Sequence, residues 1–207
     1  MSGGCGSFPA DSSLGRRVRR VLWLVMALNL AMFGVEIIYA LRESSTAMQA
    51  DAADFLIDSA AYLLTLCVLA KSERWQAGAA LAKGVIMAGL GIAVLVGLAY
   101  RLIGESALPH PMTMGAVGAA ALAVNMLCAA LLFFFRGESL NLRSVWLCSR
   151  NDALGNLGVI AAGIGVYATR SYWPDLVVGA AISGLIFASA WSVIHEAASA
   201  LRSLRPA

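Results

Sequence analysis

Three aspartates within one apolar segment are the residues best suited to do chemistry in this sequence. Asp51, Asp54 and Asp58 occur in the run QADAADFLIDSAAY. Spacings of three and four residues place them on one face of a helix. Two carboxylates one turn apart repel each other unless a proton or a cation lies between them, and a divalent cation balances both charges. We therefore interpret Asp54 and Asp58 as metal ligands.

A second segment repeats this arrangement with a different donor. The run VWLCSRNDALGN places Cys148 and Asp152 four residues apart, so a thiolate and a carboxylate would complete a four-ligand site with the first pair. Mixed oxygen and sulfur donors suit zinc and also admit Co, Cd or Fe(II). Cys148 has a second interpretation, as a small buried apolar residue, in which case Asn151 and Ser149 become the replacement ligands.

Other polar residues in apolar segments have two open interpretations each. Asp51 either extends the metal site or caps the start of its helix, a position that favours aspartate. Asn29 and Glu36 lie seven residues apart and face the same way, and Asn125 and Asn156 lie in later segments. The asparagines either orient ligands or bridge helices. Glu36 either belongs to a proton or ion pathway or pairs structurally.

The composition requires a membrane to hold these groups. Of the 207 residues 60% are hydrophobic and only 13% are charged, which leaves too little polar surface for a soluble domain. No basic patch with interleaved aromatic residues occurs, which argues against nucleic-acid binding. About 20 apolar residues cross a bilayer. We predict an all-α membrane protein, a bundle of six transmembrane helices over residues 18–41, 46–70, 78–102, 113–135, 144–168 and 173–201.

The arrangement of charges predicts how the bundle sits in the membrane. Most lysines and arginines fall on the inner side if both termini are cytoplasmic. We expect a disordered tail over residues 1–15, a transport domain over 16–202 and a short C-terminal tail over 203–207. The apolar run 21–41 is too long for the core of a signal peptide, so it is expected to stay as the first helix. The predicted location is the cell (inner) membrane, as a multi-pass protein in the lipid bilayer.

Small residues recur every fourth position in the third and sixth segments. The third has Ala80, Gly84 and Ala88, followed by Gly89, Ala93 and Gly97, and the sixth has Ala180, Gly184, Ala188 and Ser192. Such stripes allow close approach of helices in lipid. Because these segments have no acid in their apolar centres, we assign them to scaffold and dimer contacts, and the other four to the ion path.

These segments together resemble the transmembrane domain of the cation diffusion facilitator family. The resemblance rests on NLAMFGVEIIYAL, SSTAMQADAADFLIDS, NLRSVWLCSRNDALGNLGVIAAG and SYWPDLVVGAAIS. It implies a homodimeric metal/proton antiporter that exports divalent metal from the cytosol. It also implies a tetrahedral site made of Asp54, Asp58, Cys148 and Asp152, with no catalytic activity and no cofactor beyond the transported metal.

The sequence departs from the family pattern in three respects. The family usually has His where Cys148 stands, and many of its zinc members have His where Asp54 stands. The resemblance also leads us to expect a short member without the usual cytoplasmic C-terminal domain. These departures bear on which metal is carried: the thiol favours Zn, Cd or Co, and oxygen donors favour Mn or Fe(II).

We expect a divalent transition-metal efflux transporter that exchanges metal for protons by alternating access, with zinc as the first choice of substrate. One alternative is a passive cation channel lined by carboxylates, which would show no proton coupling. Another is a transporter selective for Mn, Fe, Co or Cd. An intramembrane hydrolase with paired aspartates would need a substrate cleft, for which the sequence offers no sign.

Overall fold

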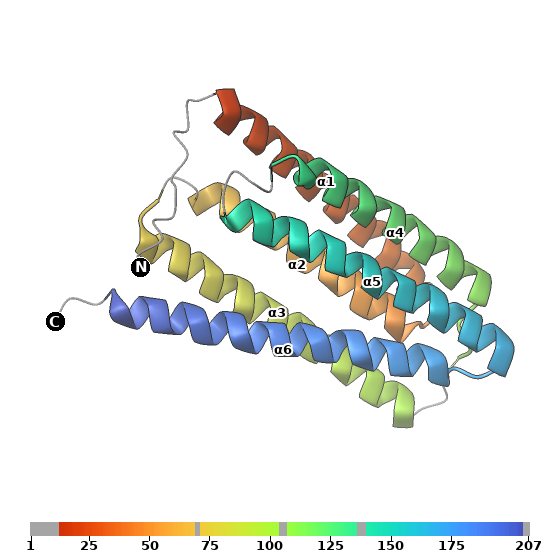
Figure 1. The fold of residues 1–207 in the computed structure, drawn as a ribbon. Helices are drawn as coiled ribbons and strands as arrows, with labels where there is room; N and C mark the ends of the chain where they lie inside the picture. The colour runs from red at the N-terminus through yellow and green to blue at the C-terminus, as the bar shows by residue number, and fades with distance from the viewer. Residues whose placement is uncertain (1–12, 69–70, 104–106, 136–139, 205–207) are drawn as a thin grey trace.

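The computed structural model describes residues 13–68, 71–103, 107–135 and 140–204, without the side chains of residues 13–14 and 140–151. This part of the chain is helical, in agreement with the predicted all-α fold (Figure 1). Six helices follow one another along the chain: α1 (Ser13–Arg42), α2 (Thr46–Val68), α3 (Glu73–Ile103), α4 (Pro111–Phe133), α5 (Leu140–Thr169) and α6 (Trp173–Ser203).

The helices extend beyond the predicted spans at several ends. Helix α1 begins at Ser13, inside the range expected for the tail, and α3 begins at Glu73 rather than at residue 78. The added turns carry charged residues such as Arg16 and Arg74. Hydropathy marks the part of a helix that lies in hydrocarbon, whereas charged residues with good helix propensity continue the helix into the headgroup region.

Five of the described helices are long and apolar enough to cross a membrane: α1, α3, α4, α5 and α6. Helix α2 is the exception, because every stretch of 18 residues within it contains Asp51, Asp54 and Asp58. It is nevertheless enclosed by the others, with contacts to α1, α3, α5 and α6. The chain is therefore a multi-pass membrane protein whose most acidic helix is surrounded by apolar ones.

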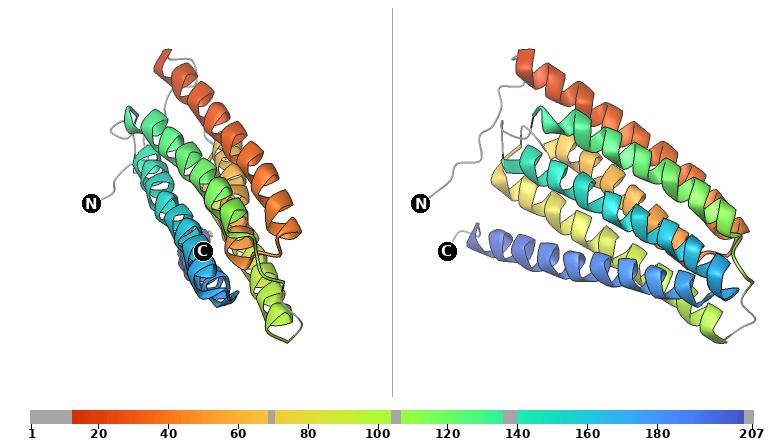
Figure 2. Two further views of the ribbon diagram at one scale, coloured as in Figure 1. Left: turned by 90° about the vertical axis from the view of Figure 1, so that its right-hand side faces the viewer. Right: turned by 45° about the vertical axis from the view of Figure 1, so that its right-hand side comes forward.

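The bundle is built from neighbours that run in opposite directions. The closest pairs are α1 with α2, α3 with α6, and α4 with α5, and all six axes follow roughly one direction (Figure 2). The first turn of α1 and the last turn of α6 lie at the same end (Figure 1). This agrees with an even number of spans.

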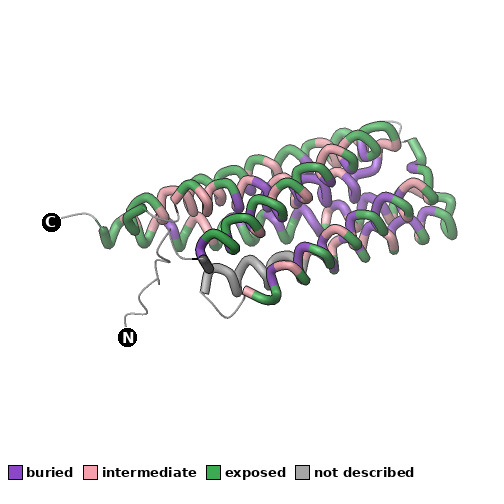
Figure 3. The backbone as a smooth tube through the Cα atoms, turned by 90° about the horizontal axis from the view of Figure 1, so that it is seen from above, coloured by how far each residue is buried: buried purple, intermediate pink, exposed green. Residues whose placement is uncertain are grey.

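The surface of the bundle is apolar and its interior holds the polar residues. Large side chains such as Trp23, Ile103, Phe134 and Trp191 are exposed, as expected where lipid covers them. Figure 3 shows exposed stretches along the outside of the helices and buried stretches where they face one another. The buried polar residues include Asn29, Glu36, Asp51, Asp58, Asn125 and Asn156.

Asp175 joins three helices at the end of the bundle opposite the termini. Its side chain is fully buried and forms an ion pair with Arg101 of α3, with 2.6 Å between Nη1 and Oδ2. Its carboxylate also accepts hydrogen bonds from the backbone N–H groups of Thr46 (2.8 Å) and Ala47 (3.1 Å). These are donors of the first turn of α2, which no carbonyl within the helix can reach.

Two further contacts complete this arrangement, which we call the Asp175 anchor. The Ser45 hydroxyl donates to Asp175 Oδ1 at 2.5 Å and accepts from the Met48 N–H at 3.2 Å, the usual bond of a helix N-cap. Gly179, one turn along α6, has no room for a side chain, because an added Cβ would lie 2.7–2.9 Å from atoms of Thr46 and Ala47. The anchor therefore fixes the start of α2 against α3 and α6.

Candidate metal centre

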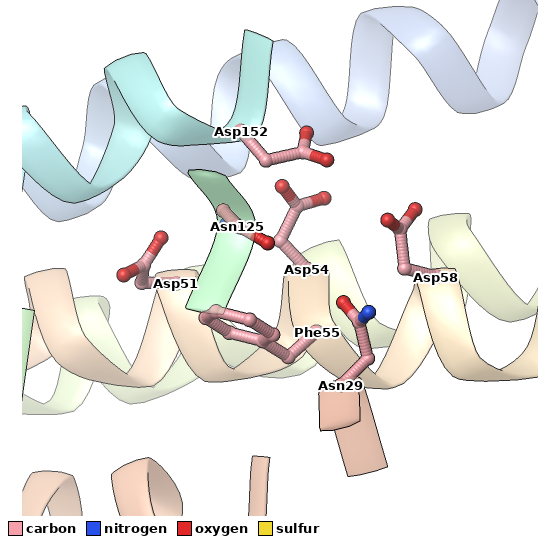
Figure 4. Close-up of a pocket in the computed structure, with 7 residues that line it drawn as sticks. All are labelled: Asn29, Asp51, Asp54, Phe55, Asp58, Asn125 and Asp152. Carbon is pink, nitrogen blue, oxygen red and sulfur yellow. The ribbon is translucent and has the colours of Figure 1, made fainter. Parts of the chain in front are cut away.

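The three aspartates of α2 face a pocket in the middle of the bundle. Its lining comes from four helices and comprises Asn29, Asp51, Asp54, Phe55, Asp58, Asn125 and Asp152. Figure 4 shows Asp152 of α5 facing Asp54 of α2, with Asp58 one turn further along α2. The helical spacing predicted that Asp54, Asp58 and Asp152 would share one site, and the structure brings them to one pocket.

The carboxyl of Asp152 lies between those of the two ligand candidates on α2. It is within hydrogen-bonding reach of Asp54 and also of Asp58. Among the side chains that the structure describes, however, no three His, Cys, Asp or Glu residues converge closely enough to hold a metal ion. Three carboxylates repel each other without a cation between them, so a closer arrangement requires the ion itself or a further ligand.

The proposed sulfur ligand lies outside the side chains that the structure describes. Cys148 is part of α5, one turn before Asp152 along the helix, and the alternative ligands Ser149 and Asn151 lie in the same stretch. The helical path supports the i, i+4 relation with Asp152.

Asp58 has a polar neighbour from its own helix and further polar groups nearby. The Tyr62 hydroxyl donates to Asp58 Oδ2 at 3.3 Å, and the side chain of Asp58 is 8% exposed. Asn29 of α1 lines the same pocket and donates to the Val25 carbonyl (2.8 Å) and to the Cys128 sulfur (3.5 Å). Its amide oxygen has no hydrogen-bond donor within the described chain. This oxygen is therefore available to a cation.

Asp51 is a buried member of a polar network rather than a helix cap. Its side chain is 2% exposed, and its Oδ2 accepts a hydrogen bond from Asn156 Nδ2 at 2.7 Å. Asn156 in turn accepts from Asn125 Nδ2 at 2.9 Å. The capping interpretation of Asp51 is wrong, because Ser45 and Asp175 cap the first turn of α2. Asn125 and Asn156 bridge α4, α5 and α2 by these bonds, and through Asp51 they also reach the pocket, so both of their predicted roles stay open.

Two functional candidates were not singled out from the sequence. Lys83 of α3 is near enough for its positive charge to act on Asp54 and Asp58, although its sequence position placed it only on the inner side of the bundle. Asp175 stands in the first turn of α6, where an acid suits the helix dipole and attracts no notice. Only the fold reveals that its partners lie on α2 and α3.

Comparison with known proteins gives a consistent family assignment. Residues 22–202 match the model of the cation efflux transmembrane domain. The chain is 24% identical over 194 residues to the metal cation efflux system protein CzcD of Cupriavidus metallidurans, covering 88% of this chain and 61% of that protein. It is 28% identical over 180 residues to the zinc transporter ZitB of Escherichia coli, covering 81% and 57%. The zinc transporter ZitB of Yersinia pestis is 28% identical over 207 residues, covering 91% and 63%.

The chain thus spans about three fifths of the length of the curated relatives that it matches. The family match, in contrast, includes α2 to α5, most of α1 and α6, and every candidate ligand named above. Three findings agree on the same family. They are an acid-bearing helix within an apolar bundle, a pocket shared by α2 and α5, and a match over most of the sequence. The chain belongs to the cation efflux transmembrane domain family.

Proposed function

We propose that this protein transports divalent transition-metal cations across the membrane, in the direction of efflux. The observation that carries the proposal is the pocket in which Asp54 and Asp58 of α2 meet Asp152 of α5. Ionised groups inside a bundle are expensive and are kept where they serve a pathway. The names of the relatives, a metal cation efflux protein and zinc transporters, support the same class of substrate. The proposed role is transport, with no catalytic step.

The proposed ligands are Asp54, Asp58, Cys148 and Asp152, and the metal is the substrate. Two carboxylates from α2 would face a carboxylate and a thiolate from α5. Zinc is the first choice, because it accepts four ligands with mixed oxygen and sulfur donors. Fe(II), Mn, Co and Cd remain competitors to be tested. Asn29, whose amide oxygen lines the pocket, is a supporting ligand, and Asn151 replaces Cys148 if the thiol does not bind.

Exchange of metal for protons follows from the donors themselves. Carboxylates and thiolates bind metal only when deprotonated, so metal binding releases protons and acid releases metal. In the proposed cycle, metal from the cytosol displaces protons from the ligands. The bundle then changes conformation around the pocket, and protons from the outer side displace the metal. Such alternating access requires a site near the middle of the membrane, and the position of Asp54, Asp58 and Asp152 near the middle of α2 and α5 supports this.

The proposed setting is the cell (inner) membrane, with both termini on the cytoplasmic side and two copies of the chain in a dimer. Gly84 packs closely against α6 of its own chain, because an added Cβ would lie 2.6 Å from Ile194. Gly89 and Gly184 face open space, since a Cβ at either position meets no atom within 4 Å. These two small residues on α3 and α6 leave faces on which a second copy could pack closely.

The test is metal flux in proteoliposomes that contain one dye for metal and one for pH. We expect zinc flux with opposite proton flux in the wild type, and loss of both in Asp58→Asn and in Asp152→Asn. Glu196→Gln is the matched control, because Glu196 is an exposed acid at the inner end of α6. Metal flux without proton movement would favour a channel. Unchanged flux in both aspartate variants would exclude the proposed site.

A further inference from the structure

Glu36 of α1 is a buried acid without the partners that such a group requires. Its side chain is 0% exposed. Neither carboxylate oxygen accepts a hydrogen bond from an N–H or O–H group within the part of the chain that the structure describes. Leaving one buried acceptor unsatisfied costs about 1–3 kcal/mol, and more for a charged group. The position of Glu36 therefore calls for a proton or a cation, since no donor of the described chain serves it.

The group that Glu36 faces is another buried carboxyl. Asp51 of α2 lies within hydrogen-bonding reach of Glu36 and is 2% exposed. Asn156 donates one N–H to Asp51, and Asn125 fixes the direction of that amide by donating to its oxygen. One N–H from these amides thus serves a pair of carboxyls with four oxygens. Two facing carboxyls need a proton or a cation between them.

The backbone of α5 approaches one of these oxygens with no side chain in between. Gly155 of α5 stands opposite Asp51, and an added Cβ at Gly155 would lie 3.4 Å from Asp51 Oδ1. The amide oxygen of Asn125, which lines the pocket next to Asp54, also has no donor in the described chain. Acceptor oxygens without donors are therefore found both in the α2–α5 pocket and at Glu36.

We propose that Glu36 and Asp51 form a second binding site for a divalent cation. This site lies nearer to the α1–α2 turn than the α2–α5 pocket does. We call it the outer site. The inference rests on the proposed transport function, since the ion would reach it from Asp54, which is three residues from Asp51 and on the same helical face. With cytoplasmic termini, this site lies on the side where the ion leaves.

The main site and the outer site differ in their ligand atoms, and this difference fits movement of the ion from the first to the second. The outer site offers only oxygen ligands from two carboxylates, without the thiol proposed for the main site. Oxygen donors hold zinc and cadmium less tightly than sites with sulfur, and they suit Mn and other hard cations. A cation that moves from the main site to the outer site is therefore bound less tightly before it is released.

The experiment measures bound Cd²⁺ per chain at equilibrium, with the purified full chain in lipid nanodiscs. We expect about two ions per chain in the wild type. Glu36→Gln and Asp51→Asn should each retain about one ion, which also shows that these variants are folded. Asp58→Asn with Asp152→Asn should also retain about one ion, and adding Glu36→Gln to that pair should remove it. The exposed control Glu196→Gln should keep both ions.

Three results would overturn the outer site. In the first, Glu36→Gln and Asp51→Asn bind as many Cd²⁺ ions as the wild type. In the second, the wild type binds one ion and the loss of Asp58 and Asp152 removes it. In the third, Glu36→Gln lowers the number of protons released per metal without changing the number of ions bound, which would make the pair a proton site. Failure of the transport proposal is separate, because it would appear as unchanged flux in Asp58→Asn and Asp152→Asn.

Discussion

Removing the charge of Asp175 should destabilise the whole bundle, although this residue lies outside the metal pocket. In Asp175→Asn, Arg101 keeps its bonds to Thr46 Oγ1 (2.6 Å) and to the Ala107 carbonyl (3.3 Å) but loses its counter-charge. Breaking a buried ion pair by removing one partner costs about 3–5 kcal/mol. The lower figure applies here, because the Arg101 side chain is 12% exposed. At roughly 2–4 °C per kcal/mol for a chain of this size, the apparent melting temperature should fall by about 6–12 °C.

Asp175→Ala should be worse than Asp175→Asn, because it also removes the acceptor of two backbone N–H groups at the start of α2. Each orphaned buried donor adds about 1–3 kcal/mol. The assay is thermal unfolding of the detergent-purified protein, followed by tryptophan fluorescence. Glu196→Gln is the control, since it removes an exposed carboxylate from the other end of α6.

A double-mutant cycle separates the ion pair from general damage to packing. Arg101→Met leaves Asp175 buried without its counter-charge, and combining it with Asp175→Asn removes both charges. Residues in one network should show a coupling energy of about 0.5–3 kcal/mol, so the double variant should be more stable than the sum of the single effects implies. Strict additivity, or a melting temperature of Asp175→Asn within 2 °C of the wild type, would refute the reasoning.

Four further outcomes are expected. Lowering the pH should weaken zinc binding, because protons compete for the carboxylates and the thiolate, which bind metal only when deprotonated. Titration calorimetry at several pH values measures the zinc affinity, and an affinity that does not change with pH would contradict the prediction. Cys148→Ser should shift preference from cadmium toward manganese, since a soft donor is replaced by oxygen; competition flux assays measure the ratio, which stays constant if the thiol does not bind. Gly179→Ala should lower the free energy of unfolding by about 1–3 kcal/mol through overpacking against Thr46, whereas Gly184→Ala should change it by no more than about 0.5 kcal/mol. Thermal unfolding compares the two variants, and equal effects would contradict the packing argument. Tyr62→Phe should weaken zinc affinity only modestly, because it removes a long 3.3 Å bond to Asp58, and a complete loss of binding would show that Tyr62 has a larger role.

The fold was predictable because each physical signal in this sequence is strong and local. Apolar runs of membrane length give the number of helices, and short connectors between them make neighbours antiparallel. Helix α2 shows the value of combining two signals. Its three aspartates are more charged residues than a membrane span is expected to hold, yet their common face correctly indicated a helix with one side directed at a polar site. Helix ends were less predictable, as the early start of α3 at Glu73 shows.

The candidate site was predictable where residues of one helix cooperate and less so where helices meet. The spacing of Asp54 and Asp58 is a property of α2 alone, and hence could be recognised from the sequence. The network of Asp51 with Asn156 depends on how far α5 is shifted along α2, which no local pattern encodes. The same limit applies to Asp175, whose position in the first turn of α6 suggests a contribution to its own helix rather than to α2.

The Asp175 anchor has a consequence for how the chain assembles during synthesis. Asp175 bonds to Ser45, a residue that precedes it by 130 positions, so the first turn of α2 lacks its acceptor until α6 has entered the bilayer. Helix α2 therefore keeps the N–H groups of Thr46 and Ala47 without their native acceptor while the later helices are inserted. Arg101 arrives earlier, with α3, and is held without its counter-charge over the same interval. Addition of the last helix is thus the step that closes this end of the protein, and a chain stalled before residue 175 would remain open there to water and to degradation.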